Sequence, residues 1–217
     1  MRHNPQHSDI PQPTQVAIIC FINDPFDSPG GKRIGGGHLV LRELGEFLVC
    51  NGFDVSLITR LNSSSKPSFQ EFGPRYRIFR VSVGPQEEMP PSEVGTMLDE
   101  LEAAATPILC ENINGLVAIH SQYWIAGEVC RRINKRLNIR HVHHMLSFGR
   151  QKRGLGEQVH QSDQLRDRCE VDVINAVDII VAQCPTEARD LISFYPELTH
   201  RRIAIIPHGI DMDIFHD

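Results

Sequence analysis

The stretch Gln15-Val-Ala-Ile-Ile-Cys-Phe-Ile22 decides the fold class. It is a short, continuous run of apolar residues, which is typical of a strand that is covered on both faces within a parallel sheet. Gly115-Leu-Val-Ala-Ile-His120 is a second run of the same kind. Between and after these runs, segments with helical spacing alternate with short apolar segments. This alternation predicts an α/β domain, a Rossmann-like, doubly wound parallel sheet flanked by helices.

The expected elements follow one another without an internal repeat or a long linker. We predict strands at residues 15–22, 53–59, 75–83, 115–120, 139–143, 178–182 and 202–206. We predict helices at residues 38–51, 91–111, 125–137, 162–175 and 186–195. Residues 15–207 therefore form one predicted domain, preceded by a flexible tail at residues 1–14, which is rich in Pro, His, Gln and Asn.

Composition and charge narrow the class of protein. Hydrophobic residues make up 41% of the 217 residues and charged residues 23%, which is enough apolar material for a sizeable core. The net charge of -5 argues against a nucleic-acid binder, because phosphate neutralisation needs clustered Lys and Arg. No apolar run approaches the roughly 20 residues that cross a bilayer. We expect a protein without nucleic-acid partners and without a transmembrane segment.

Cysteine usage predicts the compartment. The chain has six cysteines, mostly in apolar segments and without CxxC spacing, and no secretory signal is recognisable at its start. They are Cys20, Cys50, Cys110, Cys130, Cys169 and Cys184. This pattern is typical of buried thiols in a reducing environment, so we predict a cytoplasmic protein.

The loop after the first strand is rich in glycine. Gly30-Gly31 and Gly35-Gly36-Gly37 flank Lys32 and Arg33, and the following helix is expected to begin at about His38. Glycines let backbone amides approach a ligand, and a helix N-terminus favours an anion; a flexible solvent loop is the alternative. The loop is neither a GxGxxG placed directly after a strand nor a Walker A motif.

Polar and aromatic residues follow the strand at residues 115–120. The sequence there reads His120-Ser-Gln-Tyr-Trp124. Ligands of open α/β sheets bind beyond the carboxyl ends of the strands, so His120 and Tyr123 are candidates for binding or catalysis. For Trp124 we favour packing against the next helix.

A cluster of histidines and a basic loop follow the next strand. His141, His143 and His144 are too few for a zinc site without a further ligand, and His144 points away from the other two on a strand. We therefore predict no metal. The basic stretch Ser147-Phe-Gly-Arg-Gln-Lys-Arg153 suits a phosphate, or is a solvated loop. Arg166 and Glu170 form either a surface i,i+4 pair or a site for an anionic substrate group.

Several motifs, taken in order, carry a family resemblance. They are Gly35-Gly36 with Glu43-Leu44, Gly52-Phe-Asp-Val-Ser-Leu-Ile-Thr-Arg60, Gly84-Pro85, His120-Ser-Gln-Tyr-Trp-Ile-Ala-Gly127, Ser147-Phe-Gly-Arg-Gln-Lys152, Arg166-x-x-x-Glu170, Thr186-Glu187-Ala-Arg-Asp-Leu191 and Ile206-Pro-His-Gly-Ile-Asp211. The set resembles the N-terminal domain of retaining glycosyltransferases of family 4 with the GT-B fold. It is most similar to the branch of sucrose-phosphate synthase, sucrose synthase and the mycothiol-pathway glycosyltransferase.

The resemblance implies a carbohydrate-metabolism enzyme that moves a sugar from a nucleotide-sugar, UDP- or GDP-linked, to a hydroxyl acceptor without a required metal. It also implies a C-terminal donor-binding domain, in the same or a separate chain, with residues 208–217 as the start of the linker; the chain alone is then inactive. The implied donor-diphosphate residues are Gly35, Gly36 and Gly37. The implied acceptor residues are His38, Tyr123, Arg150, Lys152 and Arg166. The catalytic group is not implied, and His120 and His144 are the candidates.

The chain departs from the family pattern at several positions. Leu146 and Gln122 stand where the family usually has histidines, and Glu87 and Glu88 follow Gly84-Pro85 where it has a lysine. A phosphorylated and a neutral acceptor both stay open. Two other interpretations also stay open: a stand-alone carbohydrate-binding or assembly module, and a different Rossmann enzyme with a nucleotide cofactor.

Overall fold

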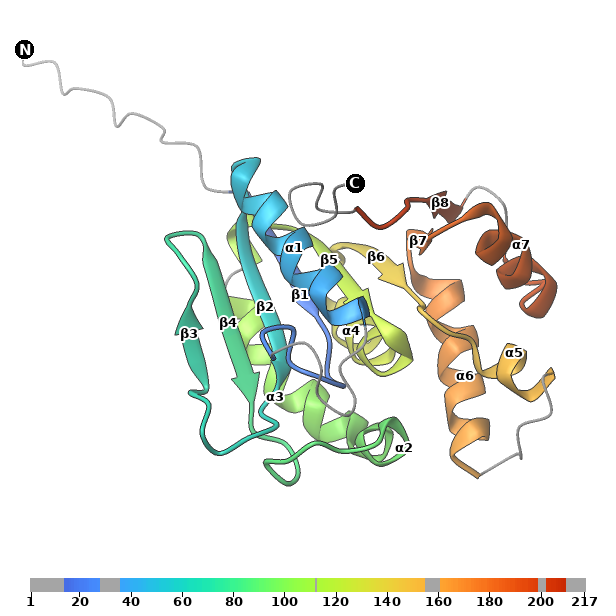
Figure 1. Ribbon diagram of the computed structural model, residues 1–217, viewed down its shortest axis with the longest axis horizontal. Helices are drawn as coiled ribbons and strands as arrows, with labels where there is room; N and C mark the ends of the chain where they lie inside the picture. The colour runs from blue at the N-terminus through green and yellow to red at the C-terminus, as the bar shows by residue number, and fades with distance from the viewer. Residues whose placement is uncertain (1–13, 28–35, 112, 155–160, 199–201, 210–217) are drawn as a thin grey trace, which may run out of the picture.

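The computed structural model describes residues 14–27, 36–111, 113–154, 161–198 and 202–209. Within these residues, eight strands form one sheet in the order β3-β4-β2-β1-β5-β6-β7-β8 (Figure 1). The strands are β1 (Gln15–Ile19), β2 (Asp54–Arg60), β3 (Phe69–Glu71), β4 (Tyr76–Val81), β5 (Leu116–Gln122), β6 (Arg140–His144), β7 (Ile179–Ala182) and β8 (Ile203–Ile205). All neighbouring pairs are parallel except β3 and β4.

Helices cover both faces of this sheet. They are α1 (Gly36–Cys50), α2 (Pro91–Val94), α3 (Leu98–Glu111), α4 (Tyr123–Leu137), α5 (Gly149–Gly154), α6 (Gln161–Ala176) and α7 (Pro185–Phe194), with 3₁₀ turns η1 (Gly95–Met97) and η2 (Ile113–Gly115). Leu41 of α1 packs with Ile18 and Leu57 on one face. Ile19 points to the other face, where α4 packs between α3 and α6. The predicted α/β class with a doubly wound parallel sheet is therefore confirmed.

The strand order reverses at β1. Its two neighbours are β2 and β5, so that Ile18 lies between Leu57 and His120. The connections run to one side of β1 in the first half of the chain and to the other side in the second half, where α5, α6 and α7 lie beside β7 in Figure 1. Such a reversal leaves a crevice at the carboxyl ends of the two central strands.

Three local predictions were wrong. Strand β3 was not expected, because Phe69–Glu71 is exposed throughout and lacks a buried apolar pattern; only its antiparallel pairing with β4 makes it a strand. The basic stretch expected as a loop forms the short helix α5. The single helix expected at residues 91–111 is divided by η1, where a side chain at Gly95 would meet the indole of Trp124 at 2.4 Å.

The prediction of buried cysteines holds for half of them. Cys20, Cys130 and Cys169 are buried, whereas Cys50, Cys110 and Cys184 are exposed. The exposed three lie near helix ends, where apolar sequence neighbours do not ensure burial; Cys184 is the N-cap of α7. None of the helices among the described residues has the length and apolar character to cross a membrane.

Candidate functional site

A cavity of about 560 Å³ opens where the strand order reverses. It lies between the segment after β1, the first turn of α1, the junction of β5 with α4, and the segment after β6. Its lining residues are Cys20, Ile22, Asn23, Gly37, Pro91, Gln122, Tyr123, Leu146, Ser147 and Lys152. This switch-point cavity occupies the crevice in which open α/β sheets bind ligands.

Two residues that line the switch-point cavity have a strained backbone. The φ angle is 70° at Tyr123 and 62° at Leu146, and a non-glycine residue in this region costs on the order of 1–3 kcal/mol. The other such residue in the described part of the chain, Asn138, ends helix α4, where a left-handed conformation is ordinary. Because strained residues cluster at ligand sites, Tyr123 and Leu146 support a functional role for this cavity.

Gln122 connects the end of β5 to the start of α1. Its Nε2 donates to the carbonyl oxygen of Gly37 over 3.0 Å. Its Oε1 is buried and has no hydrogen-bond partner among the described residues. A side chain at Gly37 would come within 3.2 Å of Leu146 Cδ1, so glycine allows this close approach. Sequence reasoning singled out Gln122 only as a departure from the family pattern, although its place at the end of the buried strand β5 is the signal that identifies it.

Arg166 lies directly behind the cavity wall. Its Nε donates to Glu170 Oε1 over 2.6 Å and its Nη2 donates to the carbonyl oxygen of Ser147 over 2.8 Å. The guanidinium carbon lies 5.1 Å from the centre of the Tyr123 ring. Arg166 and Glu170 are both buried, so their pair is not the exposed surface pair that the spacing alone allowed. A fixed positive charge therefore stands behind two residues that line the cavity.

Glu170 also orders the segment after β6. Besides the guanidinium of Arg166, it accepts hydrogen bonds from the backbone nitrogen of Gly149, over 3.0 Å, and from the hydroxyl of Tyr195.

Burial raises the pKa of the Tyr123 phenol, although the nearby Arg166 opposes the shift. The phenol thus stays neutral at pH 7 and can donate a hydrogen bond to a ligand in the cavity.

The side chains of the basic stretch point in two directions. Lys152 is exposed and lines the cavity. Arg150 instead donates to the carbonyl oxygen of Phe194 over 2.7 Å, and its guanidinium lies 4.7 Å from the centre of the Tyr195 ring. The structure therefore brings Lys152 to the candidate site and directs the guanidinium of Arg150 toward α7.

The glycine loop is described only at its end. Gly35 lies outside the described residues, Gly36 is the first residue of α1, and Gly37 lines the cavity. His38 lies in the first turn of α1, and its side chain is outside the described part. Diphosphate binding by these glycines and acceptor binding by His38 stay predictions.

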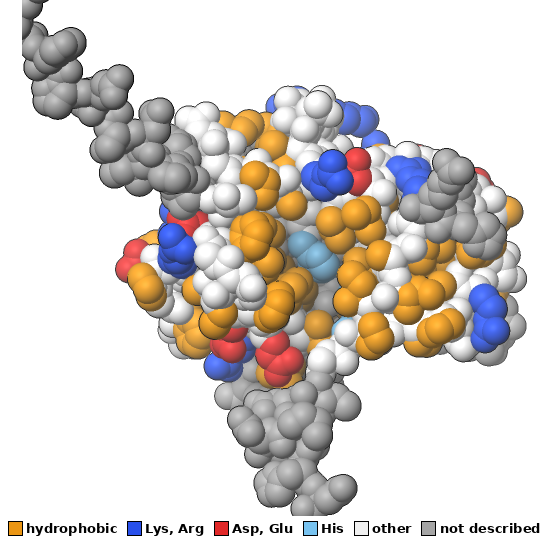
Figure 2. All heavy atoms as spheres, turned by 90° about the horizontal axis from the view of Figure 1, so that it is seen from above, with side chains coloured by type: hydrophobic (Ala, Val, Ile, Leu, Met, Phe, Trp, Pro, Cys, Tyr) orange, Lys and Arg blue, Asp and Glu red, His pale blue; other side chains and the backbone are white. Residues whose placement is uncertain are grey.

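Three histidines lie near the carboxyl ends of strands. His120 is in β5, His144 ends β6, and His208 follows β8, with 5.4 Å between the ring centres of His144 and His208. Burial lowers the pKa of His120 to about 4 and that of His144 to about 3. Nε2 of His120 and of His208 is buried without a hydrogen-bond partner among the described residues. Figure 2 shows a hollow, ringed by hydrophobic side chains, with histidine at its bottom. At pH 7 the rings of His120 and His144 can form hydrogen bonds but bring no positive charge.

The other two histidines of β6 belong to the interior. Ser121 Oγ lies 2.7 Å from His141 Nε2 and 2.7 Å from His143 Nδ1, and all three residues are buried. Their mutual hydrogen bonds explain these polar groups within the core. In the part of the chain that the structure describes, no three His, Cys, Asp or Glu side chains are grouped so that they could hold a metal ion.

A buried ionic cluster supports the segment that leaves β1. Asp24 accepts from Arg80 Nε over 2.6 Å and from Lys66 Nζ over 3.0 Å, and Lys66 also pairs with Asp27. Hydrogen bonds from Arg80 and Lys66 outweigh burial and lower the pKa of Asp24. Sequence reasoning missed this cluster, because the partners of Asp24 are 42 and 56 residues away. The cluster holds the backbone next to Ile22 and Asn23, which line the cavity.

The sheet order and the cavity at its reversal point define a Rossmann-like domain with a ligand-binding crevice. Residues 35–209 match the family described as the glycosyl transferase 4-like domain. The chain belongs to this family.

A curated relative agrees with this assignment, and solved structures share the fold. A D-inositol 3-phosphate glycosyltransferase of Acidothermus cellulolyticus is 31% identical over 205 residues, covering 94% of this chain and 46% of that protein. Sucrose-phosphate synthase from Thermosynechococcus elongatus superposes with a TM-score of 0.85 at 24% identity, over 94% of this chain and 50% of that one. Anabaena HepE, solved in complex with UDP and glucose, has a TM-score of 0.58 at 11% identity, over 93% of this chain and 46% of that one. The chain spans about half the length of the relatives that it matches.

Proposed function

We propose that this chain is the acceptor-binding half of a retaining glycosyltransferase, which moves a sugar from a nucleotide-sugar to a hydroxyl group of an acceptor. The observation that carries the proposal is the switch-point cavity, lined by the strained residues Tyr123 and Leu146, in a chain of the glycosyl transferase 4-like family. We place the protein in the cytoplasm, because its described cysteines are free thiols.

The acceptor in this proposal occupies the switch-point cavity. The Tyr123 phenol and the Ser147 hydroxyl offer hydrogen bonds, and the ammonium group of Lys152 lies at the wall. The buried charge of Arg166 lies behind Tyr123 and Ser147. Lys152 brings a positive charge to the wall, and Arg166, which is paired with Glu170, directs its guanidinium at Tyr123 and Ser147. This arrangement favours an acceptor that carries an anionic group. The name of the Acidothermus relative, a D-inositol 3-phosphate glycosyltransferase, supports a phosphorylated acceptor.

The donor in this proposal binds across the cavity from the acceptor. Backbone amides at Gly36 and Gly37, in the first turn of α1, and at Gly35, which precedes them in the sequence, would stabilise the negative charge that develops on the departing diphosphate. The UDP and ADP complexes among the similar solved structures support a nucleotide-sugar donor. A C-terminal domain, in the same or a separate chain, completes the donor pocket in this proposal, and the chain alone does not catalyse transfer.

Acceptor binding can be tested with this chain alone. We would titrate it with D-inositol 3-phosphate and with unphosphorylated inositol and follow backbone amide signals by NMR. The proposal predicts saturable shifts around Tyr123, Ser147 and Lys152, and binding at least about tenfold tighter for the phosphorylated probe. Lys152→Ala should weaken the phosphorylated probe only, whereas Arg189→Ala, an exposed arginine on α7, should leave both unchanged. Saturable shifts elsewhere, with none at the cavity, would refute the acceptor site.

Catalysis needs the complete protein. We would isolate the native protein with an antibody to this chain, determine its mass, and assay it with UDP- and GDP-linked sugars. A protein of about twice 24.5 kDa, or a co-purified second chain, together with transfer and retention at the anomeric carbon, is the expected result. A native protein of this length alone that binds carbohydrate without transfer would instead establish a stand-alone binding module.

A further inference from the structure

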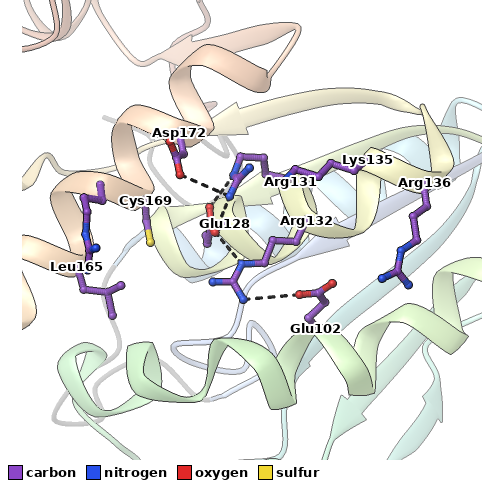
Figure 3. Close-up of a pocket in the computed structure, with 10 residues that line it drawn as sticks. Glu102, Glu128, Arg131, Arg132, Lys135, Arg136, Leu165, Cys169 and Asp172 are labelled. Atoms are coloured by element: carbon purple, nitrogen blue, oxygen red, sulfur yellow. Dashed lines mark hydrogen bonds and ion pairs between the residues drawn. The ribbon is translucent and has the colours of Figure 1, made fainter.

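A second cavity lies in the helical layer, between α3, α4 and α6, and it shares no lining residue with the switch-point cavity. Its volume is about 560 Å³. Basic side chains dominate its wall, as the close-up in Figure 3 shows for those on α4. The charged residues that carry the argument are Glu128, Arg131, Arg132, Lys135, Arg136 and Arg168. This cavity is called the helix groove below.

The basic side chains share one face of α4. Arg131, Arg132, Lys135 and Arg136 follow Glu128 by three, four, seven and eight positions, which is the spacing of neighbours on one side of a helix. Arg168 approaches the same groove from α6. The groove therefore collects cations from two helices rather than from one sequence segment.

A buried carboxylate orients two of the guanidinium groups. Glu128 accepts from Arg131 Nε and Nη2 over 2.7 and 2.8 Å, and from Arg132 Nε over 2.7 Å. The Glu128 side chain is only 3% exposed. Burial disfavours its charge, but the hydrogen bonds from both arginines lower its pKa. Glu128 is thus a carboxylate at neutral pH, and the two arginines have fixed positions before a ligand arrives.

The remaining acidic partners are weakly held. Arg131 lies 3.5 Å from Asp172, which is 58% exposed. Arg132 lies 2.6 Å from Asp99, which is 91% exposed, and 3.6 Å from Glu102, which is 25% exposed. Exposed pairs contribute only about 0–1 kcal/mol, so an anion with better geometry can replace Asp172 and Asp99. Lys135, Arg136 and Arg168 have no ion pair with a carboxylate among the residues that the structure describes.

We infer that the helix groove binds the phosphate group of a small ligand, through Arg131 and Arg132 together with Lys135 and Arg168. Glu128 holds Nε and Nη2 of Arg131 and Nε of Arg132, so the other guanidinium nitrogens donate to the phosphate, and the ammonium of Lys135 adds a point charge. The five cations of the lining exceed its three carboxylates, which favours a ligand with two negative charges. This site is separate from the proposed acceptor and donor sites.

Pyrophosphate is the probe for a direct test on this chain. At low ionic strength we expect saturable binding by calorimetry and NMR shifts at residues 128–136 and 165–172. Lys135→Ala combined with Arg168→Ala should weaken this binding at least about tenfold. Both side chains are exposed, so the variant should keep its fold. Arg189→Ala is the matched control and should bind as the wild type does. Shifts confined to Gly37 and Lys152, or equal binding by the double variant, would overturn the inference.

A second arm identifies the source of the phosphate. Vesicles of phosphatidylcholine with phosphatidylglycerol, compared with phosphatidylcholine alone, test whether a lipid headgroup supplies it. Phosphatidylglycerol-dependent binding that the double variant loses would support the site with a lipid ligand, and pyrophosphate binding alone would support a free phosphorylated ligand. Absence of both would refute the site.

Discussion

The pair of Arg166 and Glu170 offers the sharpest stability test, because the same spacing occurs elsewhere in the chain in the opposite environment. Arg166 and Glu170 are 9% and 0% exposed, whereas Arg42 and Glu46, also four residues apart, are 41% and 42% exposed. The sequence cannot distinguish these two pairs. We therefore compare Glu170→Ala with Glu46→Ala in otherwise identical proteins.

The expected magnitudes differ by an order of magnitude. Glu170→Ala leaves the buried guanidinium of Arg166 uncompensated and removes the acceptor of Gly149 and Tyr195. Breaking a buried pair in this way costs about 3–5 kcal/mol. Glu46→Ala removes an exposed pair and costs about 0.3–0.5 kcal/mol. Glu170→Gln keeps an acceptor oxygen but loses the charge, so its effect should lie between the two.

Urea unfolding at equilibrium measures these differences. With a slope of about 3 kcal/mol per molar, the midpoint of Glu170→Ala should fall by about 1–1.7 M relative to the wild type. That of Glu46→Ala should move by less than about 0.2 M. If the free energies of unfolding of Glu170→Ala and Glu46→Ala differ by less than about 1 kcal/mol, Arg166 is not held by a buried ion pair. The argument for a fixed charge behind the cavity then fails.

Three further predictions concern packing, pH and the cavity. Gly95→Ala should lower the free energy of unfolding by about 1–3 kcal/mol, because the added methyl would meet the Trp124 indole at 2.4 Å. Unfolding followed by the fluorescence of this single Trp measures the change. A variant as stable as the wild type would contradict the prediction. Burial lowers the pKa of His144 to about 3, from about 6.5 in the unfolded chain. Between these two pH values the unfolded chain therefore binds more protons than the folded protein does. The free energy of unfolding should therefore fall as the pH drops from about 6.5 towards 3, by up to about 1.4 kcal/mol per pH unit for this group. His144→Gln should reduce this dependence on pH, which urea unfolding at a series of pH values measures. Equal slopes for the variant and the wild type would exclude His144 as the cause. Gly37→Val should weaken the binding of D-inositol 3-phosphate by at least about tenfold, because a branched side chain would press on Leu146 at the cavity wall; the NMR titration of the wild type and the variant tests this, and unchanged affinity would mean that the probe binds elsewhere.

Much of the fold could be predicted from local pattern. The apolar runs at β1 and β5 and the helical spacing of α1 and α4 are properties of neighbouring residues, and each was found within a few residues of its observed bounds. Strand β3 could not be predicted, because its stability comes from pairing with β4 rather than from its own composition. The turn η1 could not be predicted either, because the side chain that restricts Gly95 is the Trp124 indole of helix α4.

The candidate site was predicted in outline only. Tyr123 lines the cavity directly after β5, and Gly37 and Lys152 line it from α1 and α5, the first helices after β1 and β6. Arg150 is two residues from Lys152, but its guanidinium contacts Phe194 and Tyr195. On a short helix, neighbouring side chains point in different directions, and the sequence does not show which of them faces the sheet.

The sequence by itself determined the class of fold and the family, because hydrophobic periodicity and the ordered motifs are both properties of neighbouring residues in the chain. Tertiary structure alone decided which polar groups meet. Arg166 reaches Ser147, Gln122 reaches Gly37, and Arg80 reaches Asp24 across 19, 85 and 56 residues of chain. Hydrogen bonds and ion pairs act over a few ångströms in space, so their partners exist only once the strands and helices have packed.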